Sequence, residues 1–151
     1  MKKFKLTSEF IVDISGVKLF RIKALIEFGN VKAGDLGGYI EKEENLSHMG
    51  DAWVSGDARI SGDAQVFGDA QVSGDARVSG DKDYAYAHGF GSCNRTTTFF
   101  RLKDGDVGVR CGCFYGTLAQ FRDKVCETHG ETKKAQEYLM LADLMEIRFK
   151  N

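Results

Sequence analysis

The sequence has no proline, no long apolar run and no excess of either charge. Without proline, collagen and proline-rich linkers are excluded, and turns must rely on the 18 glycines. No stretch approaches the roughly 20 apolar residues that span a bilayer, and residues 1–5 lead into no signal-peptide core. With 21 basic and 22 acidic residues among 151, a broadly basic nucleic-acid binder is excluded, although a local basic patch is not. We therefore expect a globular, cytoplasmic chain of about one domain's length.

A six-residue repeat runs through residues 50–83. Five copies begin with Gly-Asp and carry alanine third and an aliphatic residue fifth, and a degenerate sixth copy begins at Gly80. This period does not fit the 3.6-residue turn of a helix, whereas short strands with a corner at each Ser-Gly-Asp accommodate it. The repeat therefore predicts short strands whose alanine and aliphatic residues point the same way.

The hexads resemble the hexapeptide-repeat family of left-handed parallel β-helices, in which an aliphatic residue is followed four positions later by a small one, as in Val54 and Ala58. The resemblance implies a triangular coil of three hexads, so that residues eighteen apart stack. Val54 is then expected to lie on Val72, and Arg59 on Arg77. The resemblance also implies trimers, which would cap so short a core.

The flanking segments predict two further units. The run 10–25, interrupted at Ser15-Gly16, and the run 95–111, interrupted at 103–106, are typical of hairpins. A capping-box pattern at Thr117 predicts one helix, and Thr132 opens a second with Tyr138, Leu141 and Met145 at helical spacing.

The predicted fold class is mainly β with a small α+β part. A β-rich N-terminal cap covers 1–45, a short left-handed parallel β-helix core covers 46–83, and a ββαα C-terminal lobe covers 84–151.

Metal sites have two candidate sources in the sequence. The aspartates of the hexads are either turn residues, which we favour, or a calcium ladder. Cys111-Gly112-Cys113, with Cys93, Cys126 and His129, invites zinc, but structural zinc sites use wider Cys-x₂₋₄-Cys spacing. A nucleophilic cysteine with His129 as its base is a further option. We favour free thiols and predict no metal and no cofactor.

The second predicted hairpin and its surroundings concentrate hydroxyl and guanidinium groups. Arginine forks and threonine hydroxyls suit phosphate oxygens or acidic side chains. An ordinary solvated β-surface is the alternative. The candidate ligand-binding residues are Ser92, Arg95, Thr96, Thr97, Thr98, Arg101, Arg110 and His129.

Nearly the whole chain resembles small proteins encoded by phages and prophages of Gram-positive bacteria. The resemblance rests on FGNVKAGDLGGYIE at 28–41, the hexads, and residues 111–117. It implies a viral protein in the host cytoplasm, and such proteins often block host defence proteins or sequester their nucleotide signals.

We therefore expect a non-enzymatic, counter-defence binding protein that forms a homo-oligomer, with a trimer favoured. The expected partner is a host protein or an anionic nucleotide, with no membrane, and nucleic acid stays open. The alternatives are a hexapeptide-type acyltransferase with His88 as general base, and a purely structural assembly module.

Overall fold

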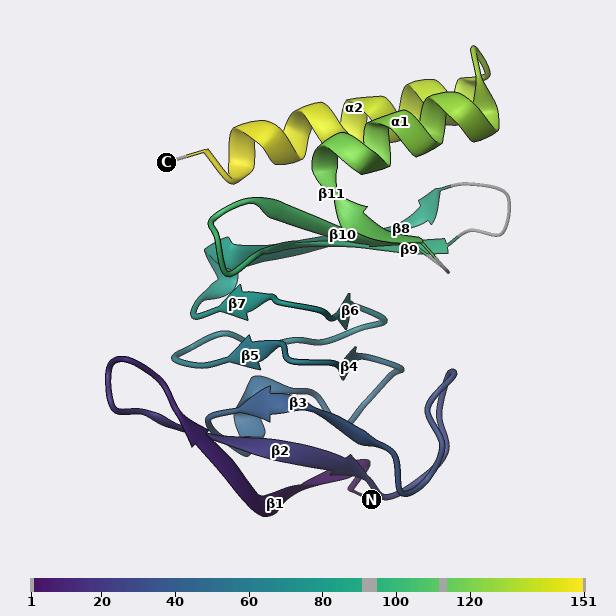
Figure 1. The fold of residues 1–151 in the computed structure, drawn as a ribbon. Coiled ribbons are helices and arrows are strands. Elements are labelled where there is room, and N and C mark those ends of the chain that lie inside the picture. The colour runs from purple at the N-terminus through teal and green to yellow at the C-terminus, as the bar shows by residue number, and fades with distance from the viewer. Residues whose placement is uncertain (1, 91–94, 112–113, 151) are drawn as a thin grey trace.

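The computed structural model describes residues 2–90, 95–111 and 114–150, with the backbone alone for Asp81 and Arg95. Figure 1 shows tiers stacked one on another: an N-terminal hairpin layer, the repeat, an antiparallel sheet and finally two helices. The two helices cover the face of the antiparallel sheet that is turned away from the repeat (Figure 1).

The N-terminal tier is an antiparallel arrangement of β1 (Phe4–Val12), β2 (Lys18–Ala24) and β3 (Leu36–Ile40). The predicted hairpin is confirmed, and its turn is held by the Asp13 carboxylate, which accepts hydrogen bonds from the amides of residues 15 and 17. A 3₁₀ turn at Glu43–Asn45 leads from β3 into the repeat.

The repeat forms parallel ladders with the predicted spacing of eighteen residues. Val54 pairs with Val72, and Arg59 pairs with Arg77, which confirms the expected stacking. Each strand has only two residues, because the Ser-Gly-Asp corner that follows interrupts it. The strands are β4 (Trp53–Val54), β5 (Arg59–Ile60), β6 (Gln71–Val72) and β7 (Arg77–Val78).

The predicted fold class is wrong, because no β-helix solenoid is formed and the described chain is a mixed α/β protein with three sheets and two helices. β5 and β7 extend the N-terminal hairpin layer into a five-stranded mixed sheet, whereas β4 and β6 form a separate pair. The remaining hexad position at Val66 forms no strand and makes only a single parallel bridge with Leu46. Five hexads are too few to build a closed coil of their own, so their strands complete a sheet that the hairpin begins.

The corners of the repeat need glycine for conformational reasons. Gly62 has φ +60°, and a Cβ at this position would collide with the carbonyl oxygen of Ser79, which lies at a later corner of the repeat. The aspartates beside these glycines are exposed, and the Asp69 carboxylate accepts a hydrogen bond from the amide of Asp51 at 3.4 Å. This contact is the corner role predicted for the aspartates.

The C-terminal tier is a four-stranded antiparallel sheet in the order β11-β10-β9-β8, followed by two helices. The predicted ββαα lobe is therefore wrong in its strand count, although its hairpin of β9 and β10 is confirmed. Thr117 and Thr132 cap the two helices as predicted. The elements are β8 (Tyr84–Phe90), preceded by a 3₁₀ turn at Asp81–Asp83, β9 (Arg95–Arg101), β10 (Val107–Cys111), β11 (Phe114–Thr117), α1 (Leu118–His129) and α2 (Lys133–Arg148).

Two hydrophobic cores meet at β9, because successive side chains of a strand point to opposite faces. Phe100 belongs to the core of stacked alanine and aliphatic residues inside the repeat. Phe99 belongs to the core between the sheet and the helices, where its ring meets Phe121 edge-on. β9 therefore joins the repeat to the C-terminal helices.

Candidate functional site

Two of the predicted ligand-binding threonines are buried. Thr97 faces the helices and donates to the Sγ of Cys111 at 3.3 Å. Thr98 faces the repeat, where its hydroxyl accepts a hydrogen bond from the backbone amide of Gln71 at 2.9 Å. The Thr98 hydroxyl joins the repeat to the C-terminal sheet, the Thr97 hydroxyl links two strands of that sheet, and neither faces solvent.

Arg101 is held in a structural network at the junction of the tiers. Its Nε donates to the carboxylate of Asp83 at 3.1 Å, and its Nη2 donates to the carbonyl oxygen of Phe149 at 3.1 Å. Burial alone would raise the pKa of Asp83, but hydrogen bonds from Ser79 and Arg101 outweigh this effect and hold the pKa below its usual value. Arg101 therefore ties the end of the repeat to the end of α2.

Of three further predicted residues, the structure describes only the side chain of His129. His129, the last residue of α1, lies beside the ring of Tyr138, with centroids 5.8 Å apart. Ser92 and the side chain of Arg95 lie outside the described part of the structure. Ligand binding by these residues stays a prediction.

Thr96 and Arg110 line one groove, here called the central groove, of about 770 Å³. It lies between the loop before β3, the β4–β6 side of the repeat and the C-terminal sheet. The Nη1 of Arg110 approaches the hydroxyl of Ser73 at 3.4 Å. Three aspartates, Asp35, Asp51 and Asp69, also line the groove. These carboxylates would repel an anionic ligand, so the groove does not favour one.

His88, the candidate general base, lies on β8 directly opposite Thr96 on β9. Its Nδ1 is 2.7 Å from the Thr96 hydroxyl, and the contact is exposed. Within the described residues, no carboxylate hydrogen-bonds the other ring nitrogen. An exposed cross-strand pair of this kind stabilises a sheet modestly and lacks the third group that orients a catalytic base.

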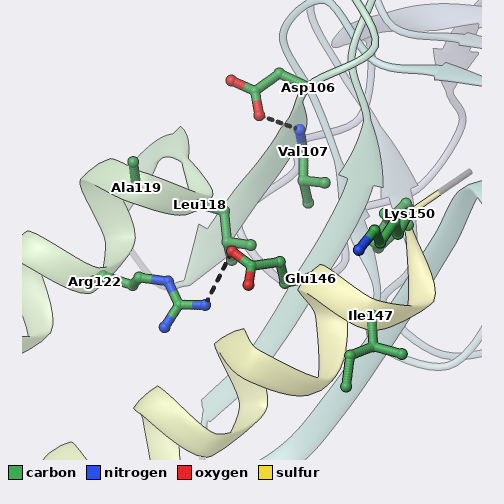
Figure 2. A pocket seen from close by; sticks show the side chains of 9 residues that line it. Asp106, Val107, Leu118, Ala119, Arg122, Glu146, Ile147 and Lys150 are labelled. Atoms are coloured by element: carbon green, nitrogen blue, oxygen red, sulfur yellow. Dashed lines mark hydrogen bonds and ion pairs between the residues drawn. The ribbon is translucent and has the colours of Figure 1, made fainter.

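A second groove, here called the C-terminal groove, has a volume of about 690 Å³ (Figure 2). Figure 2 shows Arg122 of α1 facing Glu146 of α2, with Nη2 and Oε1 3.5 Å apart. Arg122 also pairs with Asp143 at 2.7 Å. The other lining residues are Asp106, Val107, Leu118, Ala119, Ile147, Phe149 and Lys150. An apolar floor with a paired, charged rim is the chemistry of a docking groove for a protein segment.

The outer face of α2 carries an apolar stripe that continues from this groove. Met140, Leu144 and Ile147 are 71%, 54% and 72% exposed, and Ile147 also lines the C-terminal groove. On the opposite side of the helix, Tyr138 and Met145 pack into the core as predicted. The sequence analysis missed this stripe, although spacings of four and three residues signal one helical face.

The described residues offer no group of three or more histidine, cysteine, aspartate or glutamate side chains arranged to hold a metal. Cys111 is buried and Cys126 exposed, both as free thiols, whereas Cys93 and Cys113 lie outside the described ranges. None of the described helices has the length and apolar character needed to cross a membrane.

Comparison with known proteins leaves the family open. No protein-family model matches the chain, and no curated protein matches it in sequence.

Proposed function

We propose that the protein is a non-enzymatic, homo-oligomeric binding protein that self-associates through the outer face of α2. The observation that carries the proposal is the stripe of Met140, Leu144 and Ile147. Each of these side chains exposes more than half of its surface, although the same helix has its other face buried. Burying a leucine or isoleucine side chain fully contributes about 1.5–3 kcal/mol, so contact between copies gains free energy at each of these positions.

The heptad pattern of the stripe is compatible with the expected trimer. Met140, Leu144 and Ile147 follow the 4,3 spacing of a coiled-coil seam and occupy positions d, a and d of a heptad. Leucine at a with isoleucine at d favours three or four helices over two. Glu137 occupies the preceding a position, so the apolar seam is confined to residues 140–147, and Asp143, at position g, lies at its edge. We therefore propose three copies arranged around parallel α2 helices.

The C-terminal groove is the proposed docking site for a target protein. Ile147 belongs both to the stripe and to the groove, so each groove of the oligomer would open beside the contact between copies. Its apolar floor and the ion-paired Arg122 favour an amphipathic protein segment over a small anion. A host defence protein, implied by the resemblance to phage proteins, is the proposed target.

The acyltransferase alternative rests on His88 and is less well supported. The ring of His88 is exposed and pairs with a threonine across the sheet, without a further residue to orient it among those described. An assay with an acyl-CoA donor should therefore show no turnover that depends on His88. Turnover that disappears in His88→Ala would favour the enzyme instead.

The test of the proposal is the solution mass of matched variants by size exclusion with light scattering. Leu144→Glu places a charge in the middle of the stripe and is expected to reduce the particle to the 16.7 kDa chain. Met49→Glu, at an exposed position outside α2, is the control and should leave the oligomer intact. An oligomer that survives Leu144→Glu unchanged would refute the proposed interface.

A further inference from the structure

A second feature of the molecule lies on the outer face of the five-stranded sheet, among strands that the proposed function does not use. Tyr39 on β3, Arg59 on β5 and Arg77 on β7 are in register on neighbouring strands. The next residues along β5 and β7, Ile60 and Val78, are buried in the core. Because a strand alternates its faces, Arg59 and Arg77 project away from the core, side by side.

The two arginines differ sharply from Arg21, which occupies the same row on β2. Arg21 is fully engaged: its guanidinium contacts the Glu9 carboxylate at 2.9 Å, the Tyr39 hydroxyl at 2.6 Å and the Gly37 carbonyl oxygen at 3.1 Å. All three guanidinium nitrogens of Arg21 therefore have hydrogen-bond acceptors within the protein.

Arg59 is not satisfied in this way. Its Nε is buried and has no hydrogen-bond partner in the described part of the chain. A buried donor without an acceptor destabilises a fold, so Arg59 retains hydrogen-bonding capacity that the described residues do not use.

Arg77 adds a second positive charge beside this donor. Its Nη1 donates only to backbone carbonyl oxygens, those of Asp57 at 3.1 Å and Ala76 at 2.9 Å. Burial and the repulsion of Arg59 lower the pKa of Arg77, and the attraction of Asp75 and Asp57 only partly opposes them. No ion pair within 4.0 Å joins either arginine to a carboxylate among the described residues.

We propose that Arg59 and Arg77 form a binding site for one phosphate group of a small ligand. Strands lie about 4.8 Å apart, a separation that lets one oxyanion accept hydrogen bonds from both guanidinium groups. A phosphate monoester carries a charge of about −1.5 to −2, which matches two arginines, whereas a carboxylate matches only one.

The surroundings favour a small phosphorylated molecule over a nucleic acid. Asp57 and Asp75 lie close enough to Arg77 to act on its charge. A polynucleotide tracks along extended basic surfaces, whereas this site offers two arginines flanked by carboxylates. The site is built from the repeat and does not involve the α2 stripe, so its test is independent of the test of the proposed function.

The experiment is a titration of the full chain with inorganic phosphate at constant ionic strength, followed by NMR at the Nε–H resonances of the arginines. We expect a saturable shift of the Arg59 resonance. The matched variants are Arg59→Gln and Arg77→Gln, with Lys124→Gln, at an exposed position on α1, as the control. Each of the first two is expected to weaken binding at least about tenfold, since hydrogen bonds to charged groups contribute about 1.5–3 kcal/mol, and the control is expected to bind as the wild type does.

Three further arms keep the result decisive. Arg59→Lys retains the charge and should fold as the wild type does, but it loses the fork and should still bind phosphate more weakly. Acetate should bind at least about tenfold more weakly than phosphate, because its single charge matches one arginine. A single-stranded DNA oligonucleotide should bind no more tightly than phosphate. A shift without saturation, equal losses in Lys124→Gln, equal binding of acetate, or tighter binding of the oligonucleotide would each overturn the proposal.

Discussion

Lys3 is expected to make the protein more stable as the pH rises from 8 to 10. The side chain is 1% exposed, and its Nζ donates to the carbonyl oxygen of Ala52 at 2.7 Å. Burial lowers the pKa of Lys3 from 10.5 to about 8, and attraction by Asp51 and Asp69 only partly opposes this effect. The folded chain therefore releases this proton at a lower pH than the unfolded chain does.

The sign and size of the effect follow from proton linkage. Below pH 8 both states hold the proton, so the burial cost of the charge is constant and fully felt. Between pH 8 and 10.5 the unfolded state binds more protons than the folded state, and the free energy of unfolding rises with pH. At 1.36 kcal/mol per pKa unit, the gain by pH 10 is about 2–3 kcal/mol.

The assay is urea denaturation of wild type and Lys3→Met between pH 7 and 10. The variant keeps an aliphatic chain of similar length but has no group to titrate, so subtraction removes the contributions of tyrosines and other lysines. The wild type should gain stability relative to Lys3→Met as the pH rises. Parallel pH profiles, or a relative loss for the wild type, would refute the assignment of a buried, charged Lys3.

Three further effects are expected. Arg101→Met should lower the free energy of unfolding in urea by about 3–5 kcal/mol, because the carboxylate of Asp83 stays buried without the arginine that pairs with it. Arg122→Gln, at a more exposed ion pair, should cost less than about 1 kcal/mol. Equal losses in the two variants would contradict a buried ion pair between Arg101 and Asp83. The pKa of Asp83 lies below 3.8 in the folded chain, so its contribution to the free energy of unfolding is complete above that pH and is lost as the pH falls further. Acid titration should therefore destabilise the wild type more steeply than Arg101→Met. Equal slopes would count against the pairing of Asp83 with Arg101. Gly62→Ala should cost about 1–3 kcal/mol, visible as a lower Tm, because φ +60° and a backbone contact both oppose a Cβ there; an unchanged Tm would show that the corner relaxes.

Local patterns predicted the local structure well. The capping box at Thr117, the turn at Gly16 and the eighteen-residue pairing of Arg59 with Arg77 are all present. The capping box and the turn depend on residues near in sequence, so local chemistry suffices to find them. The eighteen-residue pairing was implied by the resemblance to hexapeptide-repeat proteins. The alternation of Phe99 and Phe100 between two cores follows from the strand alone.

What the sequence could not predict depends on which tier a segment packs against. β3 joins the hairpin of β1 and β2 to β5, so the repeat extends a mixed sheet where a solenoid was expected. Thr97 and Thr98 are buried because the helices cover one face of β9 and the repeat covers the other. The alternation of residues along a strand does not indicate that both faces are covered. Arg101 looked like a ligand-binding arginine, but its partner Asp83 is eighteen residues away and meets it only in the folded chain.

The central claim, self-association through α2, is tested most directly by sedimentation equilibrium of the wild-type chain over a wide concentration range. The account predicts a particle of three times the 16.7 kDa chain mass, with dissociation only on dilution. A monomer at every concentration would contradict it.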